Sequence, residues 1–252
     1  MRAWRLVLAV PACVAAGLGA PPSTATGARD LGAAFALPAL RDARGSDVLR
    51  DFEALQVGRR VRRLGIDGDS ATRAWHAADA SLGRARARID APRPVATHAF
   101  VGGSASALNA LLRAPEVTAV RVAGAVIEVD EPISLDRDGQ SLDLGGATLS
   151  VGRRAPRFLV RVEHASHVTI RGGVFDRGAW AVLVHRSRDV LVEGGRYRAL
   201  TRGGVVLSDA SEAIVTSSRF TAIDGAAVLI HGDTRDAVVL GNEIVGNLGH
   251  SN

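Results

Sequence analysis

Four polar residues recur at nearly constant spacing, each directly after a short run of aliphatic residues. They are Glu163, His185, Ser208 and His231, separated by 22, 23 and 23 residues. If each aliphatic run is a strand whose last residue points inward, these four side chains point outward in one column. Neighbouring members would lie about 5 Å apart, within hydrogen-bonding reach for Glu163 and His185. We expect His185 to act as a general base beside Glu163 and His231 to contact substrate. The alternative is a solvated polar ladder.

A second polar group follows the residues that end another set of short segments. Asp176, Arg198 and Thr221 each come directly after an aromatic residue, and Arg202 and Asp224 lie in the neighbouring loops. A guanidinium group binds a carboxylate through two parallel hydrogen bonds, so arginine beside carboxylate suits recognition of a sugar acid. Ordinary ion pairing between neighbouring repeats is the alternative.

Carboxylate pairs offer a different chemistry. Glycoside hydrolysis needs two acids about 5–10 Å apart, and Asp176 with either Asp224 or Asp209 is a candidate pair. A lysine base is excluded, because all 31 residues counted as Lys or Arg are Arg. The remaining candidates for a base are arginine, histidine and Tyr197.

A third column is acidic and could bind a cation. Arginines flank it, so neutralisation at the surface is the alternative, and we expect ordinary ion pairing for Arg171 and Glu193 in another outward column. The acidic column consists of His167, Asp189, Glu212 and Asp236, and the flanking arginines are Arg186, Arg188 and Arg235.

An internal repeat would bring the residues of each polar column together. The segments VTIRGGVF, VLVEGGRY, AIVTSSRF and AVVLGNEI end at Phe175, Tyr197, Phe220 and Ile244, which are spaced by 22, 23 and 24 residues. A second strand, AVLVH, GVVLS and AVLIH, recurs every 23 residues. This period predicts one coil of a parallel β-helix. The frame of a leucine-rich repeat is absent, and an antiparallel sandwich would not show the periodicity.

The alternation within each repeat predicts which side chains face the core. Equivalent residues of successive coils stack at strand spacing, so their contacts run from coil to coil. Gly-Gly pairs at 172–173 and 194–195 mark a corner, where small or left-handed residues are needed. The predicted inward columns are Val168, Val190, Ala213 and Ala237; Ile170, Val192, Val215 and Val239; and Phe175, Tyr197, Phe220 and Ile244.

The N-terminal third has a different character. Residues 1–28 carry two arginines, an apolar run and then small residues, which predicts a cleavable export signal and a secreted or periplasmic protein. The single cysteine, Cys13, lies in this segment, so no disulfide framework is expected. Residues 29–95 form a leader with predicted helices at 45–58 and 67–90. A short helix at 107–112 then opens the predicted β-helix domain, residues 96–252.

The charge distribution limits the class of partner. The formal net charge is +5, but the surplus lies in residues 41–94, with 12 Arg against 8 acidic residues. Residues 95–252 are close to neutral, with 16 Arg against 17 acidic residues. We therefore expect no nucleic-acid partner. No second segment is long and apolar enough to span a membrane, and the sequence leaves the oligomeric state open.

The repeats, together with the entry segment ASALNALLRA and the strands VTAVRVAGAVIEVDEPISL, resemble the right-handed parallel β-helix proteins of the pectate-lyase-like superfamily. The resemblance covers residues 100–252. It implies a right-handed parallel β-helix, preceded by a short α-helical segment, with ligand bound along the outer strand faces. Lyases of this superfamily often use Arg or Lys as the base and neutralise the substrate carboxylate with Ca²⁺ or Arg. The last coil stops before its second strand, which we interpret as a truncated chain whose further coils are missing.

The sequence thus predicts an exported protein that binds a polysaccharide. The leading expectation is a lyase acting on an acidic polysaccharide, with His185, Arg198 and Glu163 as catalytic residues. Substrate contacts are expected from His231, Asp176, Asp224, Arg202 and Asp209. A non-catalytic carbohydrate-binding or adhesion protein is the main alternative, and a glycoside hydrolase or epimerase of the same fold is another.

Overall fold

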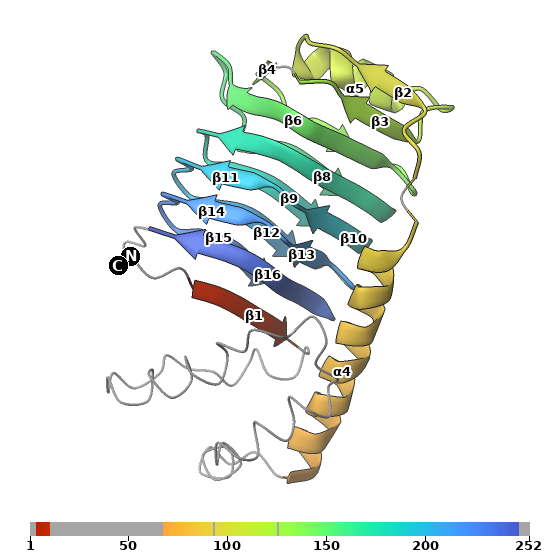
Figure 1. The fold of residues 1–252 in the computed structure, drawn as a ribbon, viewed down its shortest axis with the longest axis vertical. Helices are drawn as coiled ribbons and strands as arrows, with labels where there is room; N and C mark the ends of the chain where they lie inside the picture. The colour runs from red at the N-terminus through yellow and green to blue at the C-terminus, as the bar shows by residue number, and fades with distance from the viewer. Residues whose placement is uncertain (1–3, 11–67, 93, 125, 247–252) are drawn as a thin grey trace.

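Repeated strands stack in parallel register along most of the described chain. The computed structural model describes residues 4–10, 68–92, 94–124 and 126–246, with side chains from residue 76 onward. Successive repeats wind into a β-solenoid of about six turns (Figure 1). This confirms the predicted all-β solenoid with a helical segment before it. The predicted helix at 45–58 lies outside the described residues.

Each turn contributes to three faces. The largest sheet has eleven strands and bends along a line of residues with positive φ, which are glycines except for Ser217 and which divide it into face 1 and face 2. Face 1 consists of β2 (His98–Phe100), β3 (Ala119–Val122), β10 (Arg188–Glu193), β13 (Ile214–Thr216) and the first parts of β6 (Ser141–Val151), β8 (Ser166–Asp176) and β16 (Ala237–Val245).

Faces 2 and 3 complete each turn. Face 2 is formed by the last parts of β6, β8 and β16 together with β4 (Val126–Val129), β11 (Arg196–Arg198) and β14 (Arg219–Thr221). Face 3 is the separate five-stranded sheet: β5 (Ile133–Leu135), β7 (Phe158–Glu163), β9 (Trp180–His185), β12 (Gly203–Ser208) and β15 (Ala226–His231).

The corner between faces 1 and 2 explains the Gly-Gly pairs. Gly172 and Gly194 adopt φ angles of 65° and 70°, the left-handed region that glycine enters without strain. A Cβ on Gly172 would lie 2.9 Å from the carbonyl oxygen of Gly145, its neighbour in the preceding turn. The pairs therefore make a corner of the coil, as predicted.

The core is a set of ladders that run along the solenoid. The predicted columns that begin with Val168 and Ile170 are buried throughout. The rings of Phe175, Tyr197 and Phe220 stack with centroid separations of 4.6 and 4.5 Å and with planes 9° and 8° apart. Ile244 packs against the same core. Each turn thus buries its apolar side chains against the equivalent side chains of its neighbours.

Helix α5 (Ala105–Arg113) covers the first turn. Ser104 caps it by accepting a hydrogen bond from the Ala107 amide, and Leu108 and Leu112 enter the core. The Asn109 side chain accepts from the Ser134 amide and donates to the Pro132 carbonyl, which ties α5 to β5. The predicted helix at 107–112 is confirmed and is slightly longer.

Helix α4 (Gly68–Asp90) runs lengthwise along the stack (Figure 1), which confirms the helix predicted at 67–90. Its last turns lie on the outer side of face 1, where Leu82 and Ala85 pack against Leu191, Ile214 and Val238. At the last turn of the solenoid, β1 (Trp4–Val10) pairs antiparallel with β16. β1 falls within the segment predicted to be an export signal.

Candidate functional site

The predicted polar column on face 3 exists. Glu163 is in register with His185, His185 with Ser208, and Ser208 with His231, each on the next strand. All four residues end their strands, so the column lies along the edge where face 3 turns toward face 1. We refer to these four residues as the histidine row.

Within the row, His185 is held by a chain of two hydrogen bonds. The Ser208 hydroxyl donates to Asp209 Oδ2 at 3.1 Å, and its oxygen lies 3.3 Å from Nδ1 of His185. With the single hydroxyl proton assigned to the bond with Asp209, Nδ1 of His185 is assigned as the donor to Ser208. This arrangement puts the proton of a neutral imidazole on Nδ1 and leaves the lone pair on Nε2. No group in the described part of the chain binds Nε2.

Asp209 is kept ionised by its surroundings. Its Oδ1 accepts the backbone N–H of Asp233 at 2.9 Å. This hydrogen bond, followed by that from Ser208 and by the charges of His185 and Arg186, lowers the pKa of Asp209. A carboxylate 3.7 Å from Nδ1 of His185 would stabilise the imidazolium that forms when Nε2 takes up a proton.

The predicted partner of His185 is engaged elsewhere. Glu163 forms an ion pair with Arg161, two residues earlier on β7, at 3.4 Å, and His185 turns to Ser208 and Asp209 instead. The ring of His164 meets that of His185 edge to face, with centroids 6.1 Å apart. Register alone predicted the neighbours correctly, but not which of them would share a hydrogen bond.

The predicted arginine group lies on face 2. Arg198 Nε donates to Asp176 Oδ1 at 2.9 Å, and Arg177 lies 3.6 Å from the other carboxylate oxygen. Thr221 continues this column, and its hydroxyl donates to the Tyr197 carbonyl. Arg202 and Asp224 are exposed in the turns that lead to face 3. The carboxylate of Asp176 is thus bound by two guanidinium groups.

The two groups are far apart. Asp176 and Arg198 lie where face 2 ends, whereas His185 and Asp209 lie at the opposite end of face 3. A six-residue strand such as β9 spans about 17–20 Å. The predicted catalytic residues His185 and Arg198 therefore do not share one site. The same separation removes Asp176 and Asp209 as a pair for hydrolysis.

Tyr197 is unable to act as a base toward a bound ligand. Its ring is fully buried between Phe175 and Phe220. Burial raises the pKa of its hydroxyl far above the ordinary value, since the phenolate would lose its hydration. Of the three types of base considered from the sequence, arginine and histidine therefore remain.

Helix α4 neutralises the acidic column. Arg88 pairs with Asp189 at 2.9 Å, and Arg84 lies 3.4 Å from Asp236. Of the predicted flanking arginines, Arg188 pairs with Glu212. Within the described residues, no group of three or more His, Cys, Asp or Glu side chains is arranged to hold a metal ion. The column therefore docks the helix, a role that the sequence did not indicate.

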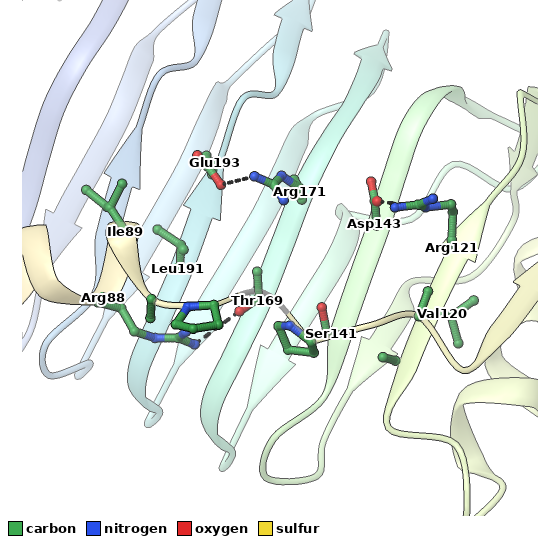
Figure 2. Close-up of a pocket in the computed structure, with 15 residues that line it drawn as sticks. Arg88, Ile89, Val120, Arg121, Ser141, Asp143, Thr169, Arg171, Leu191 and Glu193 are labelled. Atoms are coloured by element: carbon green, nitrogen blue, oxygen red, sulfur yellow. Dashed lines mark hydrogen bonds and ion pairs between the residues drawn. The ribbon is translucent and has the colours of Figure 1, made fainter.

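A cleft of about 180 Å³ lies between face 1 and the segment that follows α4 (Figure 2). Its floor includes Ser141 and Thr169, and Arg88 donates to the Thr169 hydroxyl at one end. The charged side chains along it form ion pairs, Arg121 with Asp143 at 3.1 Å and Arg171 with Glu193 at 3.0 Å. The latter is the pair expected from the sequence.

Comparison with known proteins gives no relative: no family model, curated protein or solved structure matches the chain. Among the helices of the described residues, none has the length and apolar character needed to cross a membrane.

Proposed function

We propose that the chain is an exported β-helix protein that cleaves an acidic polysaccharide by β-elimination at the histidine row, as expected of a pectate-lyase-like protein. The observation that supports this proposal is the His185–Ser208–Asp209 chain of hydrogen bonds. It favours the tautomer with the proton on Nδ1, keeps a negative charge close to the ring and leaves Nε2 without a hydrogen-bond partner among the described residues.

The reaction would begin with Nε2 of His185 taking the proton from the sugar carbon that bears the carboxylate. The electron pair of that C–H bond forms a double bond while the glycosidic C–O bond breaks, and solvent protonates the departing oxygen. Arg161, beside Glu163, and Arg186, beside Asp209, are the cations nearest the row that could neutralise the substrate carboxylate.

The test is incubation of the protein with polygalacturonate and with alginate, followed by ultraviolet absorbance of the unsaturated product. We expect His185→Gln to abolish the product, because glutamine offers no base. His98→Gln, a change on β2 away from the row, is the matched control and should leave the rate unchanged.

Other outcomes of the same assay would indicate one of the alternative functions. New reducing ends without unsaturated product would indicate a hydrolase, and polymer binding without any cleavage would indicate a binding protein. Cleavage that survives His185→Gln would refute the assignment of the base.

A further inference from the structure

Two arginines lie directly opposite each other on the outer side of face 2. Arg196 of β11 is in register with Arg219 of β14, and both side chains are exposed. Adjacent strands lie about 4.8 Å apart, and like charges directly opposite each other destabilise a sheet. The fold therefore loses stability by placing these two residues together.

The same chain avoids this arrangement on face 1. There the equivalent outward column reads Arg121, Asp143, Arg171, Glu193 on four successive turns, so that each charge has an opposite neighbour. The contrast shows that alternation of charge is compatible with this solenoid. The repeat itself does not explain the arginine pair of face 2.

Neighbouring side chains leave a positive excess on face 2. Asp176 is shared between Arg198 and Arg177, and Glu243 pairs with Arg219 at 3.5 Å. Four arginines thus face two carboxylates, and Arg196 has no carboxylate partner within the described residues. The four, which we call the arginine strip, are Arg177, Arg196, Arg198 and Arg219.

The strip is open to a large ligand. The side chains of Arg177, Arg198 and Arg219 are 72%, 55% and 56% exposed. The aromatic residues of this face, Phe175, Tyr197 and Phe220, all point into the core and are 0% exposed. Single-stranded nucleic acid is held by stacking its bases on aromatic side chains, and face 2 offers none on its outer side in these turns.

We propose that the arginine strip is a second binding surface, which holds an acidic polysaccharide chain apart from the histidine row. A polysaccharide lying along the solenoid axis would meet a guanidinium group on successive turns. Each guanidinium could bind a carboxylate or sulfate through two parallel hydrogen bonds. The strip would keep the polymer at the protein surface and raise its local concentration. The class of ligand is that of the proposed function, but the surface is separate.

The experiment measures binding of polygalacturonate to the full chain by calorimetry at several salt concentrations. The double variant Arg196→Gln/Arg219→Gln should bind at least about tenfold more weakly. The slope of log K against log salt should fall by about two, one for each lost charge. Arg121→Gln, which removes an exposed arginine from the alternating column of face 1, is the matched control and should keep the affinity of the parent.

Failure of this inference is separable from failure of the proposed function. His185→Gln should lose cleavage and keep polymer binding, whereas the double variant should lose binding. Equal affinity of the double variant and the parent would overturn the inference, as would tighter binding of single-stranded DNA than of polygalacturonate. The double variant relieves the contact between Arg196 and Arg219 and also removes the exposed Arg219–Glu243 pair, so its thermal midpoint should stay close to that of the parent. A weak affinity then reports the surface itself.

Discussion

Arg88 of α4 and Asp189 of β10 form a 2.9 Å ion pair between positions 101 residues apart. The same guanidinium donates to the Thr169 hydroxyl, so one side chain fastens the end of the helix to two turns of the solenoid. Both charged side chains are about one-fifth exposed, which reduces screening by solvent.

Replacing Arg88 with alanine should loosen the end of α4. We expect the free energy of unfolding to fall by about 1 kcal/mol, measured by urea denaturation, and trypsin to cut faster within α4. Arg121→Ala breaks a pair whose guanidinium is 66% exposed and should cost less than about 0.5 kcal/mol. Equal losses in the two variants would mean that Arg88 does not anchor the helix.

Tyr197→Phe should stabilise the protein. The Tyr197 hydroxyl is buried and makes no hydrogen bond of acceptable geometry with a described residue, while phenylalanine occupies the equivalent place in both adjacent turns. Removing an unsatisfied buried hydroxyl while keeping the ring should add about 1 kcal/mol to the free energy of unfolding. Chemical denaturation measures it, and a loss of stability would indicate that an ordered water binds the hydroxyl.

The same residue should make stability depend on alkaline pH. Burial raises the pKa of Tyr197 in the folded state, so above the unfolded value of about 10 the unfolded chain loses the phenol proton while the folded protein keeps it. The free energy of unfolding is therefore unaffected by this group below that pH and falls as pH rises above it. The thermal midpoint of the parent should therefore fall more steeply above pH 10 than that of Tyr197→Phe. Parallel curves would contradict the burial of this hydroxyl.

Much of the fold could be predicted because the repeat is a property of the sequence itself. A period of 22 to 24 residues places Glu163 beside His185 and Arg196 beside Arg219 whatever the details of each turn. The inward ladders follow from alternation within each strand. Both arguments need only the spacing of residue types.

Side-chain partners were harder to predict. Glu163 pairs with Arg161 of its own strand instead of with His185. Asp209 accepts the hydrogen bond of Ser208, which in turn contacts His185. Register shows which strands are neighbours, but it does not show which side chains form hydrogen bonds. The docking of α4 depends on contacts between residues 81 to 155 positions apart, for which no periodic signal exists. The sequence therefore left the acidic column open between a cation site and neutralisation by neighbouring arginines, and did not indicate that α4 supplies two of those arginines.

The turn between β14 and β15 should tolerate no side chain at Gly225. Its φ is +124°, and a Cβ there would overlap the carbonyl oxygen of Arg202 in the preceding turn. Gly225→Ala should cost more than about 3 kcal/mol. Gly102→Ala also requires a positive φ but meets nothing within 4 Å, so its cost should stay near 1 kcal/mol. Similar losses in the two variants would show that the backbones of these turns can separate.

Asp209→Asn tests the polar chain behind His185 through its pH dependence. The Asp233 amide, Ser208 and the nearby positive charges lower the pKa of Asp209, so its stabilising contribution is present above the unfolded value of about 3.9 and is lost as pH falls through the folded value. Asparagine keeps an acceptor for the Asp233 amide but has no charge. The thermal midpoints of parent and variant should therefore differ at neutral pH and converge in acid, and a constant difference would mean that Asp209 contributes through its shape and not its charge.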